Sequence, residues 1–446
     1  MGQPKNKAKI EGPVYNARSL GYPRMLGLGA QFTCAMFAGN VLVAVLVGLD
    51  TATTMFVAGL GTLLFHFITK WKVPVFLGSS FAFMAAYTVV APNAEPELLR
   101  YACFGMVIAG IIYVIFGQLI RVFGVNRIMS LFPAVVTGPI ILCIGTGMAA
   151  SAVTMAAEDW LLAIVAAVAC VICSVYGKGM VKIMPIMIGL VMSYLLGVVL
   201  GRVDFTPVAE AAWIGFPIKW EYTVFSIFEN PNVGMLISAT LTTIPMCFAA
   251  LIEHVGDIVA VGNTVGQNFV KAPGLHRTLA GDGLATALAS LLGGPSNTTF
   301  TEGTAVLSLT KVYDPVVVRI AAVIMTLLGC CPKLAAIVNC IPGGTLGGVS
   351  IIMYATLTTV GLRSLIDKRV DLNKPRNMMI AGIIILLTVG VKYGFANGIE
   401  LAVGGISFSL SGMAVGALVG ILLNAILPGR ETEVVLDEEE SAPITK

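Results

Sequence analysis

Long runs of apolar residues without a charge limit the possible folds of this chain more than any other feature. Hydrophobic residues make up 57% of its 446 residues, whereas Asp, Glu, Lys and Arg together make up 11%, against about 25% in an ordinary soluble protein. A helix that crosses a bilayer needs about 20 mostly apolar residues. The composition therefore excludes a water-soluble enzyme and predicts an all-α protein that crosses the membrane many times. A net charge of +3, with basic residues in short clusters beside the apolar runs, predicts no nucleic acid partner.

We expect about 14 transmembrane segments. Eleven runs are long and mostly free of charge: 26–49, 51–69, 101–120, 128–151, 160–177, 181–200, 233–262, 316–332, 343–362, 377–391 and 405–427. Three weaker runs are short or are broken by Gly, Pro, Ser and Thr: 73–90, 278–293 and 297–312. An even number of segments places both termini on the same side of the membrane.

Basic residues predict which side holds the termini, because short cytoplasmic loops are enriched in Lys and Arg. With the N-terminus inside, the predicted inner loops hold these basic residues: Lys70 and Lys72, Arg121 and Arg127, Lys178 and Lys182, Lys271 and Arg277, Lys311 and Arg319, and Arg363 to Arg376. The predicted outer loops are acidic or mixed, with Lys333 as the exception. The N-terminal tail (1–23) and the acidic tail (429–446) are therefore both predicted to be cytoplasmic.

Two of the weak runs share one design. Val73–Ser80 and Gly293–Thr304 are irregular stretches with glycine, proline and hydroxyl residues, and each leads into apolar residues. We interpret each as a short strand that runs into a half-helix. Phe81 and Thr301 lie at corresponding places 220 residues apart. Their segments, the third and the tenth, are offset by seven, and this odd number predicts an inverted repeat. Broken segments at matching places are typical of transporter sites, because free N–H groups at half-helix N-termini can face a substrate. The alternative is two re-entrant kinks without a ligand.

Three carboxylates lie in runs that should be inside the membrane. Between residues 231 and 270 the only acidic, basic or histidine residues are Glu253, His254 and Asp257, and Glu302 lies in the second broken run. A charge at the bilayer centre costs about 2.5–3.5 kcal/mol on insertion scales, so these side chains must face protein or water. Glu253 and Asp257 are four residues apart and share a helix face.

Acids that lie close together in a poorly hydrated cavity resist full ionisation. At least one of Glu253, Asp257 and Glu302 is therefore predicted to take up and release a proton. The alternative is that these acids only fix helix packing. That structural role is the one we expect for His254, because a helix turns it about 100° away from Glu253.

Motifs of the common enzyme classes are missing from the sequence. It has no HExxH, no Gly-rich phosphate loop that ends in Lys-Ser or Lys-Thr, and no Gly-x-Ser-x-Gly. Hydrolysis and ATP-driven pumping are therefore disfavoured. We expect no enzyme activity, no metal and no cofactor other than a co-transported proton.

Four motifs carry a resemblance to a known family: Phe76–Phe83 (FLGSSFAF), Glu253–Gly256 (EHVG), Pro273–Arg277 (PGLHR), and Asn297–Thr299 (NTT) with Glu302 behind it. In these motifs the chain closely resembles bacterial uracil permeases of the nucleobase/ascorbate transporter family. The resemblance runs from the first apolar run to the acidic tail.

The resemblance implies two inverted repeats of seven segments, which form a core domain and a gate domain. Segments one to four (24–125) and eight to eleven (231–332) would form the core. Segments five to seven with an outer loop (126–230) and segments twelve to fourteen (333–428) would form the gate. Segments three and ten would begin as short strands, and the gate domains of two copies would form a homodimer.

The resemblance also implies a binding site for a nucleobase. By matching position, Glu253 and Glu302 would accept hydrogen bonds from the ring N–H groups, and the backbone at Phe81 and Thr301 would meet the ring carbonyls. Gly39 would line the floor. Leaving such groups unpaired is unfavourable, so the site should require an intact pattern of N–H and C=O groups.

Phe81 and Phe300 would supply an aromatic face for the ring. The chain departs from the uracil permease pattern at three positions. Asp257 stands where His is typical and resembles the xanthine and urate branch, while Phe300-Thr301 replaces the usual Tyr-Gly. Glu302 instead favours the uracil branch, because purine carriers often have Gln there.

We therefore predict a multi-pass protein of the cytoplasmic membrane that imports a nucleobase with a proton, by rocking of the gate against the core. Uracil is the leading substrate, and xanthine, urate or another oxopurine is the alternative. A facilitator that needs no gradient and an anion exchanger are further alternatives. Against the exchanger, the predicted cavity holds two or three acids and no Lys or Arg.

Overall fold

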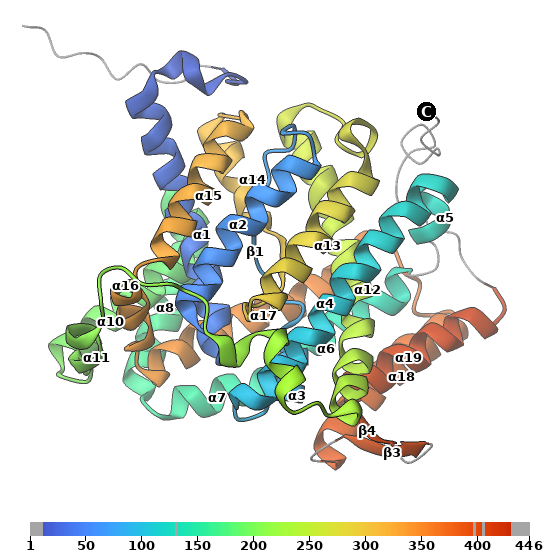
Figure 1. Cartoon of the computed structure of the whole chain (residues 1–446). Helices are drawn as coiled ribbons and strands as arrows, with labels where there is room; N and C mark the ends of the chain where they lie inside the picture. The colour runs from blue at the N-terminus through green and yellow to red at the C-terminus, as the bar shows by residue number, and fades with distance from the viewer. Residues whose placement is uncertain (1–11, 130–132, 396–397, 404–405, 430–446) are drawn as a thin grey trace, which may run out of the picture.

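The computed structural model of the chain describes residues 12–129, 133–395, 398–403 and 406–429 (Figure 1). Residues 1–11 of the predicted N-terminal tail and residues 430–446 of the predicted acidic tail lie outside that part.

Seven helices in the described part of the chain are long and apolar enough to cross a membrane. They are α1 (Tyr22–Val47), α2 (Thr51–Ile68), α4 (Pro96–Phe123), the pair α6 (Ala134–Gly147) and α7 (Ala149–Ala157) taken as one, α12 (Val233–Val265), α17 (Gly343–Asp367) and α18 (Pro375–Gly394). Shorter apolar helices are α8 (Trp160–Tyr176), α10 (Pro185–Val199) and α19 (Gly412–Ile426). The chain is therefore a multi-pass membrane protein, as its composition predicts.

The remaining helices complete or connect these segments. Two of them pack within the bundle: α13 (Leu275–Leu291) and α15 (Pro315–Gly329), with α15 bent by 82° against α16 (Pro332–Asn339). The others are short: η1 (Ala17–Leu20), α3 (Met84–Val90), α5 (Val125–Met129), α9 (Met180–Ile183), α11 (Thr206–Glu210), η2 (Trp220–Tyr222), η3 (Val224–Glu229), η4 (Val270–Gly274) and α14 (Thr301–Thr310).

The helices form two groups, and each group combines segments from both halves of the chain. In the group that we call the core bundle, α4 packs on α12 and α13, α13 on α2, α2 on α15, and α15 on α1. In the group that we call the gate bundle, α17 packs on α6, α7 and α8, α8 on α10, and α18 on α6 and α19. Figure 1 shows this mixing in the core bundle, where α15 (orange) lies beside α1 and α2 (blue).

Glycine allows close packing in the core bundle where α4 crosses α13. A Cβ atom on Gly110 would overlap the carbonyl oxygen of Gly283 and would lie 2.9 Å from the backbone nitrogen of Ala287. A residue without a side chain lets the two backbones approach this closely, which is how membrane helices gain packing energy without a hydrophobic driving force.

The two broken segments meet inside the core bundle. Strand β1 (Leu77–Ser79) pairs with β2 (Asn297–Thr299) in antiparallel register, with Gly78 opposite Thr298. Each strand runs into a helix, β1 through residues 80–83 into α3 and β2 through Phe300 into α14. The prediction of a strand followed by a half-helix is therefore confirmed at both places. Gly78 and Thr298 are 220 residues apart, the offset already noted for Phe81 and Thr301.

Side chains of neighbouring helices satisfy the outer edges of this strand pair. Asn40 accepts a hydrogen bond from the Ser79 amide at 2.8 Å. The hydroxyl of Thr62 accepts one from the Leu77 amide at 3.0 Å, and Thr286 donates one to the carbonyl oxygen of Asn297. Because unpaired backbone groups are strongly unfavourable inside a membrane, these helices and the strands depend on one another.

The prediction is wrong at the start of segment fourteen. The sequence predicts one helix over 405–427, but β3 (Ile399–Val403) and β4 (Ile406–Leu410) form an antiparallel hairpin and α19 begins at Gly412. The reason is visible in β4, where apolar and serine residues alternate with the period of two that favours a strand over a helix. The fold therefore contains strands outside segments three and ten.

The predicted N-terminal tail is partly a packed element. Val14 forms a parallel bridge with Val312, and the hydroxyl of Tyr15 donates a 2.7 Å hydrogen bond to the carbonyl oxygen of Val265 at the end of α12. The segment therefore ties the end of α12 to the linker between α14 and α15.

The Gly110 contact leads to a test of core packing. Gly110→Ala should lower the free energy of unfolding by about 1–3 kcal/mol, because the added methyl group forces the backbones of α4 and α13 apart. Thermal unfolding in detergent measures the effect, with Gly382→Ala in α18 as the matched control, because a Cβ there meets no atom within 4 Å. Equal unfolding temperatures for the two variants would contradict the packing argument.

Candidate functional site

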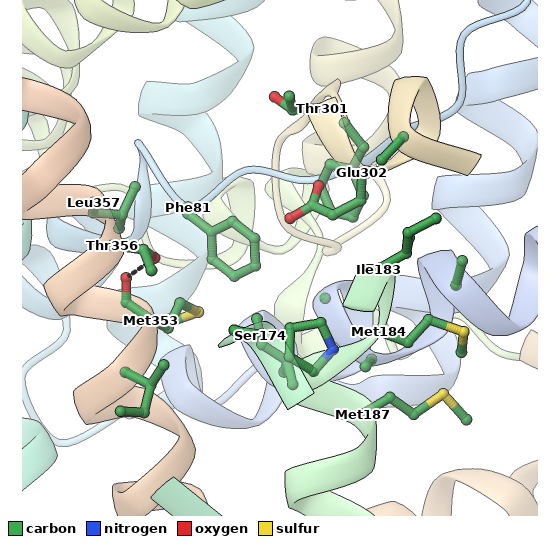
Figure 2. A pocket seen from close by; sticks show the side chains of 18 of the residues that line it. Phe81, Ser174, Ile183, Met184, Met187, Thr301, Glu302, Met353, Thr356 and Leu357 are labelled. Atoms are coloured by element: carbon green, nitrogen blue, oxygen red, sulfur yellow. Dashed lines mark hydrogen bonds between the residues drawn. The ribbon is translucent and has the colours of Figure 1, made fainter. Parts of the chain in front are cut away.

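A cavity of about 590 Å³ lies between the core bundle and the gate bundle (Figure 2). Its core side comes from α1, α12 and the two junctions between strand and helix, and its gate side from the end of α8, α9, the start of α10 and α17. Six of the seven predicted site residues line the cavity: Gly39, Phe81, Glu253, Phe300, Thr301 and Glu302. The seventh, Asp257, does not.

The strand pair places two aromatic rings at the cavity. Phe81 follows β1 and Phe300 follows β2, and the two rings are stacked with centroids 6.0 Å apart and planes 11° apart. Phe300 is 6% exposed and Phe81 is partly exposed, so Phe81 presents the open face and Phe300 supports it from behind. A Cβ on Gly39 would lie 3.0 Å from the Phe300 ring, so glycine leaves room for this ring pair.

Glu253 and Glu302 are the open carboxylates of the cavity. Glu253 lies within α12 and is nevertheless exposed, because it faces the cavity, and Glu302 lies in the first turn of α14. Within the described part of the chain, no other residue donates a hydrogen bond to either carboxylate group. The N-terminus of α14 favours a negative charge at Glu302. The two acids can therefore accept hydrogen bonds from a ligand.

Asp257 lies one helical turn after Glu253 in α12, and its surroundings differ from those of Glu253. Its carboxylate accepts hydrogen bonds from the hydroxyls of Thr299 at 2.7 Å and Thr301 at 2.9 Å, and Asp257 is 7% exposed. Glu253 and Asp257 share a helix face as predicted, but the junction between β2 and α14 covers that face at Asp257. Two of the departures from the uracil permease pattern, at 257 and 301, are thus partners in one hydrogen bond.

Asp282 of α13 is a buried acid that the sequence did not single out. Its Oδ2 lies 2.6 Å from Nδ1 of His254, whose Nε2 lies 3.1 Å from the hydroxyl of Thr278, and the side chains of His254 and Asp282 are fully buried. His254 therefore ties α12 to α13, in agreement with the structural role predicted for it. A signal was present, because Thr278 and Asp282 are four residues apart in a run of small residues and so share a face.

The cavity also contains a lysine, which the sequence analysis did not expect. Lys182 of α9 lines the gate side together with residues such as Met184 and Met353, so the prediction of a cavity without Lys or Arg is wrong. The sequence predicts Lys182 in an inner loop with Lys178, but packing of α9 against α14 brings Lys182 to the cavity. The lining residues of the gate side were missed because apolar positions in a membrane helix give no sign of whether they face lipid or a cavity.

Comparison with known proteins gives a family and a fold. Residues 24–397 match the sequence model of xanthine and uracil permeases, described as the Permease family. The chain is 38% identical to the uracil permease of Bacillus caldolyticus over 425 residues, which cover 93% of this chain and 95% of that protein. It is 36% identical to the uracil permease of Bacillus subtilis (strain 168) over 416 residues, which cover 90% of this chain and 92% of that protein.

The fold also matches a solved transporter of very different sequence. Murine Solute Carrier 26 family member A9, an anion transporter solved in the inward-facing state, matches with a TM-score of 0.64 at 11% identity. The match covers 95% of this chain and 69% of that chain. At this identity the likeness is one of fold.

The threonine contacts of Asp257 can be tested by a double-mutant cycle. Asp257→Ala and Thr299→Val remove the two sides of one hydrogen bond, so their effects on the free energy of unfolding should be non-additive by about 1 kcal/mol. Thermal unfolding in detergent measures this coupling. Thr264→Val is the control, because that exposed hydroxyl bonds the Ala260 carbonyl in its own helix. Strictly additive losses would show that Asp257 and Thr299 do not interact.

The His254 pair predicts a second pattern of stability. Asp282→Leu leaves the imidazole buried without its partner and should destabilise the protein by about 3–5 kcal/mol. The double variant His254→Leu/Asp282→Leu should recover part of that loss, because neither member of the pair then stays buried alone. Thermal unfolding of the two variants measures which is more stable. A double variant less stable than Asp282→Leu would refute this prediction.

Proposed function

Because the chain belongs to the Permease family, which consists of transporters and not of enzymes, we propose that it imports uracil together with a proton. The observation that carries this proposal is the pair of open carboxylates, Glu253 and Glu302, beside the exposed face of Phe81. Two relatives that the chain resembles over most of its length are uracil permeases.

The chemistry of the cavity suits a neutral planar ring with N–H donors. Carboxylate oxygens accept such N–H groups strongly, and two acids on different helices can address different atoms of one ring. The backbone at Phe81 and Thr301 is available for the ring carbonyls, since free N–H groups occur at the start of a helix. Phe81 offers a face for stacking.

The same two acids support coupling to protons. A neutral base brings no positive charge to Glu253 and Glu302, so their mutual repulsion is relieved most simply by binding a proton. Lys182 is the cation that lines this cavity, and it can balance one of the two charges. One proton per base would then leave the loaded cavity close to neutral.

The position of the cavity supports alternating access. It lies between the two bundles, so movement of one bundle against the other changes which side of the membrane it faces. We place both termini in the cytoplasm and the protein in the cytoplasmic membrane, on the distribution of Lys and Arg.

Inverted repeats of seven segments also belong to this proposal, with the 14 segments assigned to α1, α2, β1 with α3, α4, α6 with α7, α8, α10, α12, α13, β2 with α14, α15, α17, α18 and α19. Corresponding segments of the two repeats differ by seven, so α1 corresponds to α12, α4 to α15, α8 to α18 and α10 to α19. A contact in one repeat then predicts an equivalent contact: α1 with α15 matches α12 with α4, and α8 with α10 matches α18 with α19. All four contacts are present. The pairing of Gly78 with Thr298, 220 residues apart, supports a local twofold axis between the repeats.

An anion exchanger is the second candidate, because Lys182 lines the cavity and the fold matches that of an anion transporter. Two carboxylates beside the same lysine oppose a bound anion. The oxopurine alternative was favoured by Asp257, and it loses part of its support because Asp257 does not line the cavity. A facilitator without proton coupling is separated from the proposal by the response to a gradient.

Uptake of labelled uracil into proteoliposomes tests the proposal. Uptake should increase when the outside is made more acidic than the lumen, because protons then enter with the base. Glu302→Gln should reduce kcat/KM by about 10–100-fold, because it removes a charged acceptor of a ring N–H group. Glu97→Gln, which alters an exposed acid in the first turn of α4, is the matched control and should behave like the wild type.

Each alternative gives a distinct result in the same assay. Uptake that ignores the pH gradient would contradict proton coupling and favour a facilitator. Uptake of xanthine in preference to uracil would favour the oxopurine carrier, and exchange of sulfate or bicarbonate without uracil uptake would favour the anion exchanger.

A further inference from the structure

The two sides of the cavity differ in polarity. The core side carries Glu253, Glu302 and the hydroxyl residues of the strand junctions, whereas most residues of the gate side are apolar. We call Ile183, Met184, Met187, Met353 and Leu357 the methionine wall. In the view of Figure 2, Phe81 lies between Met353 and Leu357 of α17 on the left and Ile183, Met184 and Met187 on the right, and Glu302 lies above Ile183.

We propose that the methionine wall makes this carrier reject oxopurines because of their polarity and not because of their size, and accept uracils that carry an apolar substituent or an apolar fused ring at C5 and C6. This proposal rests on the proposed function, since it assumes that the core side binds the N–H and C=O groups of a uracil ring. It adds what the opposite side of the cavity recognises.

The methionine wall offers almost no partner for a polar atom. Thr356 lies beside it, but its hydroxyl donates a 2.6 Å hydrogen bond to the carbonyl oxygen of Met353 in its own helix (Figure 2). Ser174 and Lys182 are the other polar side chains on this side, and both are exposed. Methionine side chains are unbranched and polarizable, so they can adjust to apolar groups of different shape.

The position of the ring follows from the core side. When the N–H and C=O groups of uracil face Glu253, Glu302 and the two junctions, its C5–C6 edge is the edge without hydrogen-bonding groups, and it faces the methionine wall. In an oxopurine that edge carries an imidazole ring, whose nitrogen atoms need hydrogen-bond partners. Against the methionine wall they would lose water without gaining a partner, which is unfavourable.

Size alone does not exclude a second ring. The cavity of about 590 Å³ is within the range of about 300–1,000 Å³ that holds drug-sized ligands. A discrimination between one ring and two rings would therefore have to arise from polarity. Quinazoline-2,4-dione separates the two causes, because it is a uracil with a fused benzene ring and matches xanthine in size without the imidazole nitrogens.

Competition against binding of labelled uracil to the purified protein tests the proposal without any gradient. Quinazoline-2,4-dione should compete within about tenfold of uracil, and xanthine should compete about 100-fold more weakly, the range expected when buried polar groups stay unpaired. Met353→Gln and Met184→Gln should narrow this difference, because they supply polar partners. Met378→Gln, which alters an exposed methionine of α18 outside the cavity, is the control and should not.

The outcomes that would overturn the proposal are specific. Equal exclusion of xanthine and quinazoline-2,4-dione would show that size decides, and equal competition by both would show that the wall does not discriminate. Preferential binding of 5-carboxyuracil would place Lys182, and not the methionines, at the C5–C6 edge. If labelled uracil itself does not bind to the wild type, both the proposed function and this inference are wrong, and this result is distinct from the other three.

Discussion

The pairing of β1 with β2 is the interaction on which the site depends. A segment that breaks its helix within a membrane exposes backbone N–H and C=O groups, and the surrounding lipid cannot satisfy them. Each broken segment supplies the partner of the other, and Asn40, Thr62 and Thr286 satisfy the outer edges. Interruptions of the helix are therefore tolerated deep in the core bundle. They place the start of α14, together with Phe81 and Phe300, at the cavity.

Helix α12 shows how neighbouring positions acquire different roles. Glu253 faces the cavity, His254 is turned to the other side and pairs with Asp282 in α13, and Asp257 lies beneath the junction between β2 and α14. Two of these three polar groups hold α12 against its neighbours. These buried polar contacts fix the rotation of α12, and this keeps the third group, Glu253, directed at the cavity.

The gate bundle contributes the other half of the cavity with a different chemistry. Its lining residues come from α8, α9, α10 and α17 and include Met184, Met187 and Met353. In the proposed function, the core side binds the hydrogen-bonding groups of the ligand and the gate side discriminates by polarity. Flexible side chains that make few directional bonds also suit the proposed movement of one bundle against the other.

The sequence by itself determined the class of protein and the residues that can do chemistry. Charge-free runs require a membrane, and the unfavourable burial of Glu253, Asp257 and Glu302 marks them as functional or structural. Irregular polar stretches in two segments predicted the strand junctions, because local composition decides where a helix breaks. The family resemblance then indicated Glu253 and Glu302 as the ligand-binding acids, and both line the cavity.

Only the tertiary structure decided which groups meet. It places Glu253 in the cavity and Asp257 against Thr299. It also pairs His254 with Asp282 and brings Lys182 and the methionines to the cavity. It also replaced the start of the last predicted segment with a hairpin. The physical reason is common to these cases, because helix periodicity shows which residues share a face and not what covers that face. In a membrane protein, the same kind of apolar residue can face lipid, a neighbouring helix or a cavity.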